Sequence, residues 1–217
     1  MPSKVISNAL RSDRTVLTEV ESKQLVSEAG IPVIETRLAR TKAQAISMSK
    51  EMGFPVVLKI VSPDIIHKSD CGGVKLGLGN ITRVGKAYTE IITAVKRTSP
   101  KVAIHGISVQ KMAKPGVEVI MGMSKDAQFG PVLMFGLGGV FVEVLKDVAF
   151  RIVPLVRRDV SQMIREIKGY PLLEGYRGQE PASVTVLEDM LLKLSDFVDK
   201  TPQIKELDLN PILVSCN

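Results

Sequence analysis

The stretch from residue 54 to residue 78 constrains the fold most, because it places a polar loop between two apolar segments. Residues 54–61 are apolar except for Lys59, which is typical of a buried strand, and residues 74–78 alternate in polarity like a second strand. The loop between them carries His67, two aspartates and a Gly-Gly pair. A neutral imidazole, with an ordinary pKa of about 6.5, is a competent nucleophile near pH 7, although most loop histidines are only solvated side chains. The stretch therefore predicts paired strands with a candidate reactive loop.

The rest of the chain mixes helical and strand patterns, which predicts an α+β (mixed α/β) fold rather than a simple parallel sheet. A hairpin is predicted from a strand over residues 102–112 to a strand over residues 117–123, through a turn at residues 114–116. We expect residues 1–17 to form an N-terminal arm, residues 18–99 a small lobe and residues 100–217 a large lobe. The other predicted helices cover residues 18–29, 41–52, 84–97, 160–168 and 184–198, and the other predicted strands cover residues 131–135, 148–155 and 204–214.

Charge and composition narrow the class of protein. The net charge of +6 is spread along the chain, and the few aromatic residues include no tryptophan, so the clustered basic and aromatic surface of a nucleic-acid-binding protein is not expected. The longest apolar run, residues 132–145, is too short to span a bilayer, and the N-terminus does not resemble a signal peptide. Cys71 and Cys216 suggest neither a disulfide scaffold nor a zinc site. These features predict a cytoplasmic protein that binds neither membranes nor nucleic acid.

Three motifs together resemble a known family: Ser-Pro-Asp-Ile-Ile-His-Lys-Ser-Asp-Cys-Gly-Gly-Val at residues 62–74, Gly-Leu-Gly-Gly at residues 136–139 and Asp-Leu-Asn-Pro at residues 208–211. They resemble the beta subunit of ADP-forming acetyl-CoA synthetases, over nearly the whole chain. The resemblance implies the two-lobed ATP-grasp fold, with ATP or ADP and Mg²⁺ as ligands, and the reaction acyl-CoA + ADP + phosphate ⇌ acid + ATP + CoA. It also implies a CoA-binding alpha subunit as partner, in an alpha2beta2 assembly that receives acyl-CoA and phosphate through that partner. His67 would carry the phosphoryl group between the partner and ADP.

The same resemblance implies a set of candidate nucleotide-binding residues. A lysine on a buried strand is costly unless it meets an anion or extends to solvent, and the resemblance implies that Lys59 reaches the nucleotide phosphates. It also implies that Gln110, Lys111 and Met112 form the hinge that holds adenine through backbone groups, with Glu118 following in the nucleotide site. The family usually has glutamate where this chain has Gln110, and a purely structural hairpin is the alternative.

A glycine-rich segment and an arginine are candidates for contacts with the transferring phosphoryl group. Gly136, Gly138 and Gly139 would let backbone N–H groups approach an anion, although tight packing of the backbone explains such glycines equally well. The guanidinium of Arg151, on the next predicted strand, has the forked geometry that suits a phosphoryl group. We therefore expect Arg151 to be catalytic.

The last predicted strand suggests a metal site. Glu206, Asp208 and Asn210 alternate with leucines, so their oxygen atoms share one face of the strand. Carboxylate and amide oxygens suit Mg²⁺, whereas a solvated edge strand is the structural alternative. The resemblance favours the metal, through Asp208 and Asn210. Chains of the family that this sequence resembles continue into a further strand with another metal-site aspartate, so either an additional ligand comes from elsewhere or metal binding is weakened.

Three alternatives remain open at this point. The acid could be one other than acetate, or the chain could be a relative of succinyl-CoA synthetase, because acid selection would lie on the partner. ADP and GDP are not distinguished by these residues. A nucleotide-sensing or assembly subunit without turnover is the alternative from outside the enzyme class.

Overall fold

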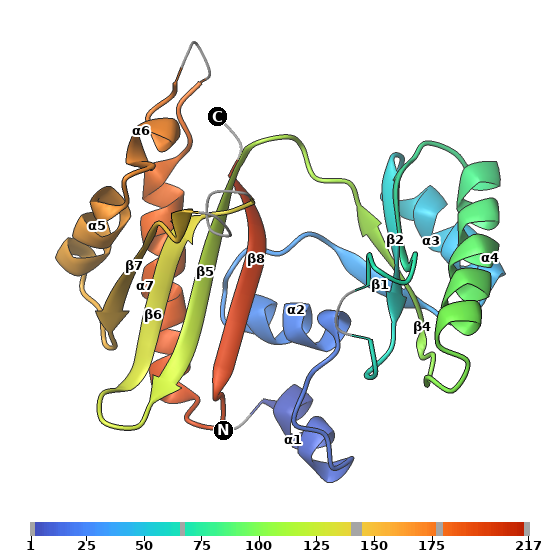
Figure 1. The fold of residues 1–217 in the computed structure, drawn as a ribbon, viewed down its shortest axis with the longest axis horizontal. Coiled ribbons are helices and arrows are strands. Elements are labelled where there is room, and N and C mark those ends of the chain that lie inside the picture. Colours follow the sequence, from blue (N-terminus) through green and yellow to red (C-terminus); the bar gives the residue numbers. More distant parts are fainter. Residues whose placement is uncertain (1–2, 66–67, 140–144, 177–179, 215–217) are drawn as a thin grey trace. The chain divides into compact units, whose positions relative to one another are not determined.

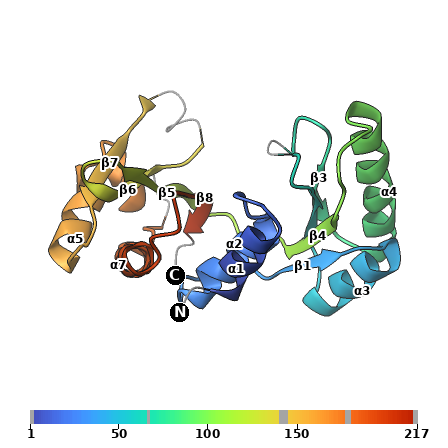
Figure 2. The same ribbon diagram turned by 90° about the horizontal axis from the view of Figure 1, so that it is seen from below.

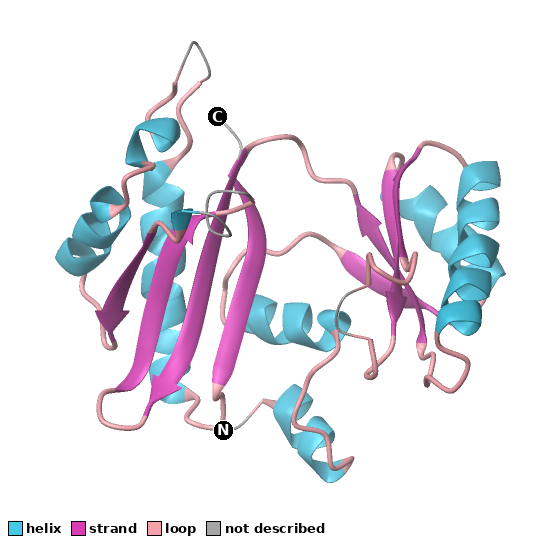
Figure 3. Cartoon of the chain, in the orientation of Figure 1, coloured by secondary structure: helices cyan, strands magenta, loops and turns pink. Residues whose placement is uncertain are grey.

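The protein is described by a computed structural model covering residues 3–65, 68–139, 145–176 and 180–214. The chain divides into two compact units. Unit 1 comprises Met1–Glu28 and Pro32–Ala113, and unit 2 comprises Ala29–Ile31 and Lys114–Asn217. Each unit combines helices with one four-stranded antiparallel sheet, so the predicted α+β class is confirmed (Figures 1 and 3).

In unit 1 the sheet has the strand order β1-β4-β2-β3, and each neighbouring pair is antiparallel. The strand that comes last in the sequence, β4, therefore lies between the two that come first. The strands are β1 (Thr36–Ala39), β2 (Val56–Val61), β3 (Val74–Leu78) and β4 (Gly106–Lys111), and the helices are α1 (Lys4–Arg11), α2 (Glu19–Glu28), α3 (Lys42–Met52) and α4 (Ile81–Thr98).

Local contacts explain where α2 and α3 begin, and a glycine marks the end of α3. Thr18 and Glu21 form a capping box at the start of α2: the backbone N–H of Thr18 donates to Glu21 Oε2 at 2.8 Å, and the N–H of Glu21 donates to Thr18 Oγ1 at 3.4 Å. Helix α3 is capped by the Thr41 hydroxyl and ends at Gly53, whose φ of 77° favours glycine. Both predicted helices are thus confirmed.

The hydrophobic core of unit 1 lies on one face of its sheet. Val56, Leu58 and Ile60 of β2 are fully buried and pack with residues of α3 and α4, which cover that face (Figures 1 and 2). Successive strand residues point to opposite faces, so Lys59 projects from the other face. The register places Lys59 opposite Ser108, and Val57 opposite Gln110. The side chains of Lys59 and Gln110 therefore share the sheet face opposite the one that α3 and α4 cover.

In unit 2 the sheet has the order β7-β6-β5-β8, again antiparallel throughout. Helices α5 and α7 pack along one face, and Figure 2 shows both on the same side of the strands. Buried Met121, Leu133 and Phe135 form the sheet side of this core. The strands are β5 (Val117–Asp126), β6 (Gly130–Leu137), β7 (Val148–Ile152) and β8 (Glu206–Val214), and the helices are α5 (Arg157–Glu166), α6 (Tyr170–Leu173) and α7 (Val184–Lys200).

Three expectations from the sequence differ from the structure. The N-terminal segment, expected to be an arm, contains a helix, α1, whose start is capped by Ser3. The predicted hairpin is wrong, because β4 pairs with β1 and β2 whereas β5 pairs with β6 and β8. Because β4 and β5 belong to different sheets, the division between the units falls after Ala113 and not near residue 99. In the described part of the chain, no helix has the length and apolar character needed to cross a membrane.

Candidate functional site

Lys59 meets a carboxylate in the structure. Its Nζ donates to Oε1 of Glu19, the first residue of α2, at 2.8 Å. The side chains are 25% and 14% exposed, so the ion pair is largely withdrawn from water. The Lys59 side chain therefore does not simply extend into solvent, which was the alternative to an anion partner. This partly buried lysine thus pairs with an anion of the protein itself.

Two further lysines share the same carboxylate. Lys23 Nζ lies 3.1 Å from Glu19 Oε1, and Lys68 Nζ lies 3.3 Å from Oε2. Burial by itself would raise the pKa of Glu19, but the three lysines outweigh it and lower that pKa to about 2. Burial lowers the pKa of Lys23. We refer to Glu19, Lys23, Lys59 and Lys68 as the lysine cluster, which carries three positive charges and one negative charge.

Lys23 also connects the cluster to the predicted adenine hinge. Its Nζ donates to Gln110 Oε1 at 2.6 Å and to Thr36 Oγ1 at 3.0 Å. The Gln110 side chain is buried and accepts this hydrogen bond, a role that a glutamate at this position could also fill. The structure therefore brings Lys59 and Gln110 together through α2, a connection that the sequence analysis did not include.

Lys111 and Met112 continue the hinge segment past Gln110. Lys111 Nζ donates to the carbonyl of Met52, the last residue of α3, at 3.0 Å, so its side chain caps a helix. The N–H of Met112 donates to the carbonyl of Pro55 at 3.1 Å. The side chains of Gln110 and Lys111 and the N–H of Met112 are thus used inside unit 1, whereas the Met112 side chain is exposed.

His67 lies outside the described residues, and the loop around it is held on both sides. Before it, Asp64 Oδ2 accepts from the backbone N–H of Ala103 at 2.7 Å. After it, the Lys68 carbonyl accepts from the N–H of Gly73 at 2.8 Å, while the Lys68 side chain reaches Glu19. Gly73 has no room for a side chain, because a Cβ there would lie 2.6 Å from the Ile60 side chain.

In unit 2, several predicted site residues share the sheet face opposite α5 and α7. Gly122 of β5 pairs with Asp208, and Glu118 lies on the same face of β5 because it is four residues away. The N–H of Gly138 donates to the carbonyl of Glu118 at 2.7 Å. A Cβ on Gly139, where φ is 61°, would lie 3.3 Å from Glu118 Oε2. The glycine segment and Glu118 are thus adjacent.

Close packing accounts for two of the three glycines. A Cβ on Gly136 would lie 2.7 Å from the carbonyl oxygen of Asp147, and one on Gly138 would lie 3.0 Å from the Glu118 Cβ. The packing alternative therefore applies to Gly136, which lies against the residue just before β7, and to Gly138, which lies against Glu118.

Asp208 and Asn210 are paired on the exposed face of β8. The leucines between the polar residues are less exposed than Glu206, Asp208 and Asn210, which confirms the predicted alternation. Partial burial raises the pKa of Asp208, and a hydrogen bond from Asn210 offsets part of this effect. Within the described residues, no group of three or more histidine, cysteine, aspartate or glutamate side chains is arranged to hold a metal. A metal here would thus take protein oxygens from a pair, as is common for Mg²⁺ bound with nucleotide phosphates.

Arg151 lies on the other face of the same sheet. It pairs with Leu133 of β6, whose side chain is in the core beneath the helices. Its guanidinium donates to Glu166 of α5 and, at 2.8 Å, to the carbonyl of Phe150. The register thus separates Arg151 from Asp208, and the structure does not bring these two predicted residues together.

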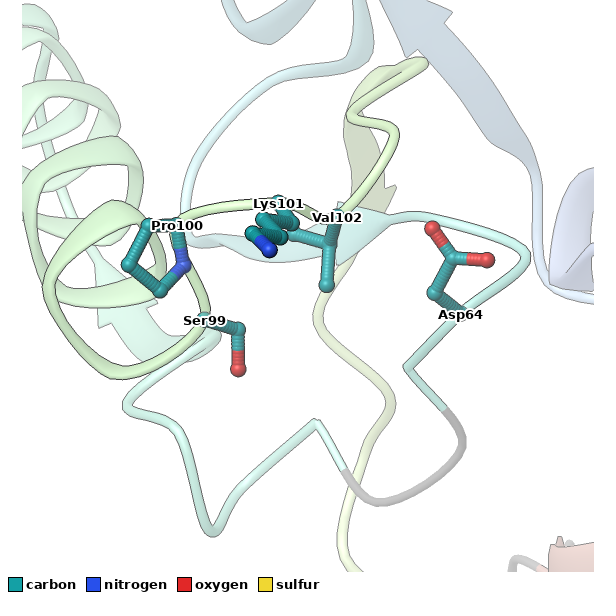
Figure 4. A pocket seen from close by; sticks show the side chains of 5 residues that line it. All are labelled: Asp64, Ser99, Pro100, Lys101 and Val102. Carbon is teal, nitrogen blue, oxygen red and sulfur yellow. The ribbon is translucent and has the colours of Figure 1, made fainter.

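A hollow on unit 1 contains none of the predicted site residues. Figure 4 shows that it is lined by Asp64, Ser99, Pro100, Lys101 and Val102. Asp64 is its only side chain from the loop before His67, and one oxygen of that carboxylate accepts a hydrogen bond from the Ala103 N–H. The hollow is therefore not assigned to the nucleotide site.

Comparison with known proteins identifies the family. The ATP-grasp domain family matches residues 8–217. The chain is 44% identical, over 97% of its length and 90% of the relative's, to the beta subunit of ADP-forming acetate–CoA ligase I of Pyrococcus furiosus. This chain belongs to that ATP-grasp family. The beta subunit of ligase II from the same organism is 46% identical to this ATP-grasp chain over 97% of the chain and 90% of the relative.

Solved structures agree with this assignment. Acetyl-coenzyme A synthetase 1 of Candidatus Korarchaeum cryptofilum, in complex with coenzyme A and Ca-AMPCP, matches with a TM-score of 0.96 and 48% identity, covering 98% of this chain and 93% of that one. Another structure of that enzyme, with Mg-AMPPCP, has its phosphohistidine segment pointing towards the nucleotide-binding site; it matches at 45% identity with a TM-score of 0.86, covering 97% of this chain and 91% of that one. The predicted family and ATP-grasp fold are thus confirmed.

Proposed function

We propose that this chain is the nucleotide-binding subunit of an ADP-forming acyl-CoA synthetase, which interconverts acyl-CoA + ADP + phosphate and acid + ATP + CoA. The observation that carries the proposal is the 44–46% identity to acetate–CoA ligase beta subunits over 97% of the chain. We further propose that it acts in the cytoplasm with a CoA-binding alpha subunit, in an alpha2beta2 assembly. Acyl-CoA and phosphate would enter through that partner.

In this proposal each unit carries candidate nucleotide-binding residues of its own. Lys59 binds phosphate, supported by the excess positive charge around Glu19. The backbone of residues 110–112 holds adenine. Glu118, Gly138 and Gly139 line the phosphate side of unit 2, supported by their contacts with one another.

Asp208 and Asn210 would hold Mg²⁺, because they offer a carboxylate and an amide oxygen on one exposed strand face. Bound Mg²⁺ would neutralise charge on the nucleotide phosphates. We do not include Arg151 in this machinery, because its guanidinium pairs with Glu166 on the helix-covered face.

His67 would be the phosphoryl carrier. In the direction of acid activation, an imidazole nitrogen attacks the γ-phosphorus of ATP, the bond from that phosphorus to the bridging oxygen breaks, and ADP leaves with the electron pair. The phosphoryl group on His67 is then passed to the partner subunit. A carrier on a loop suits this task, because it divides one long transfer into two short ones.

The test uses both histidines of the chain. Incubation of the wild-type protein with radiolabelled ATP and Mg²⁺ should give an acid-labile, base-stable label, and His67→Ala should remove it. His105→Ala is the matched control, because His105 is an exposed residue ahead of β4 and should leave the label unchanged. A His67→Ala protein with full synthetase activity alongside its partner would exclude the carrier mechanism. ATP binding without labelling of the wild type would instead favour the nucleotide-sensing alternative.

A further inference from the structure

The lysine cluster has more positive charge than its own carboxylate can balance. Lys23, Lys59 and Lys68 all lie within 3.3 Å of Glu19, and the pKa of Glu19, lowered to about 2, keeps that carboxylate charged at neutral pH. The four side chains together carry an excess of two positive charges. An excess of like charge in a partly buried site costs free energy, and a bound anion would lower that cost.

The three lysines differ in how much of their hydrogen-bonding capacity the protein uses. An ammonium has three N–H donors. Lys23 directs its donors to Glu19, Thr36 and Gln110. In the described part of the chain, the Nζ atoms of Lys59 and Lys68 each contact a single acceptor group, the carboxylate of Glu19. Lys23 therefore has a structural role, whereas Lys59 and Lys68 keep donors for a ligand.

Burial indicates the side from which a ligand would come. The Glu19 side chain is 14% exposed, and the side chains of Lys59 and Lys68 are 25% and 24% exposed. The carboxylate thus lies deeper than the ammonium groups that it holds together. An anion approaching from solvent would meet the lysines first, and the charge of Glu19 reduces the mutual repulsion of the lysines beneath it.

We propose that Lys68 is a second phosphate-binding lysine, held beside Lys59 by the shared carboxylate of Glu19. Lys59 contacts Oε1 and Lys68 contacts Oε2, so the two ammonium groups lie on either side of one carboxylate and can bind neighbouring phosphates of the same nucleotide. Glu19 is the positioning residue of this pair. The inference rests on the proposed nucleotide-binding function.

The experiment measures dissociation constants for ATP, ADP and AMP in the presence of Mg²⁺. It compares the wild type with the variants Lys59→Met, Lys68→Met and Lys86→Met. Methionine keeps an unbranched side chain and removes the charge. Lys68→Met should weaken ATP binding about 10- to 100-fold, and the loss should be smaller for AMP, which has a single phosphate. Lys86→Met is the control: it removes the same charge from unit 1 at a side chain that is 79% exposed, and should change binding less than about twofold.

The outcomes separate this inference from the proposed function. If Lys59→Met abolishes ATP binding while Lys68→Met behaves like Lys86→Met, the role of Lys68 is overturned and the proposed function stands. Equal losses for ATP and AMP in Lys68→Met would likewise overturn it, because they would indicate a structural effect. If the wild type does not bind ATP, both proposals fail. Should Lys68→Met not fold, Lys68→Gln, whose amide can still donate to Glu19, carries the same test.

Discussion

Replacing Glu19 with glutamine should make unit 1 less stable at neutral pH but not at low pH. The folded protein lowers the pKa of Glu19 from 4.5 to about 2. At about 1.4 kcal/mol for each pK unit, this shift corresponds to about 3 kcal/mol of stability. Its side chain is only 14% exposed, so solvent screening removes little of that amount.

The sign follows from the direction of the shift. A carboxyl with a lowered folded-state pKa contributes its full stability above the unfolded pKa, and loses it as the pH falls through the folded pKa. Glutamine resembles the protonated carboxyl, so Glu19→Gln should be about 3 kcal/mol less stable than the wild type at pH 7. The difference should shrink between about pH 5 and pH 2, and vanish below that range.

The assay is urea unfolding over this pH range, with hydrogen exchange of the α2 segment to report on unit 1 alone. Glu28→Gln is the control on the same helix, because Glu28 is exposed and contacts Ser3 and Gln24 instead of a cation. It should leave the pH dependence nearly unchanged. A Glu19→Gln protein whose deficit stayed constant from pH 7 to pH 2 would refute the argument that the lysines act through the charge of Glu19.

Three further predictions concern unit 2 and a helix cap. Asp208→Ala and Asn210→Ala should impair Mg²⁺-dependent turnover more than folding, whereas Leu209→Ala, on the opposite strand face, should cost about 2 kcal/mol of unfolding free energy. Activity assays and urea titrations that gave the reverse pattern would mean that the metal face is misassigned. Phe135→Ala should cost about 3–5 kcal/mol in the same titration, because Phe135 is fully buried, and a loss under about 1 kcal/mol would contradict its place in the core. Thr41→Ala should cost about 1 kcal/mol through loss of the α3 cap, and an unchanged unfolding midpoint would show that the cap contributes nothing.

Local signals in the sequence predicted the elements of this fold well. The capping pair Thr18 and Glu21 and the cap Thr41 depend on residues a few positions apart, and both appear in the structure. The choice of strand partners does not depend on such signals. The segment at residues 114–116 resembles a turn, but the strands on either side of it belong to different sheets.

The candidate site was only partly predictable, because some of its contacts join residues that are far apart in the sequence. Lys59 could be identified as a lysine in need of an anion, whereas its partner Glu19 is 40 positions away in sequence. The only local sign was the i,i+4 spacing of Glu19 and Lys23 on one helix. Arg151 could be placed on a strand, but the face to which it points depends on the register with β6, which the sequence did not indicate.

The strand order of unit 1 has a consequence for synthesis on the ribosome. Strand β4 is the last of its sheet to be made, yet it lies between β1 and β2 and pairs with both. Until residue 111 has emerged, β1 has no neighbouring strand, and β2 can pair only with β3. The nascent chain therefore presents open strand edges while α3 and α4 are already complete, and such edges favour aggregation. Arrival of β4 closes the sheet in one step, so this unit should become resistant to protease only at a late and narrowly defined chain length.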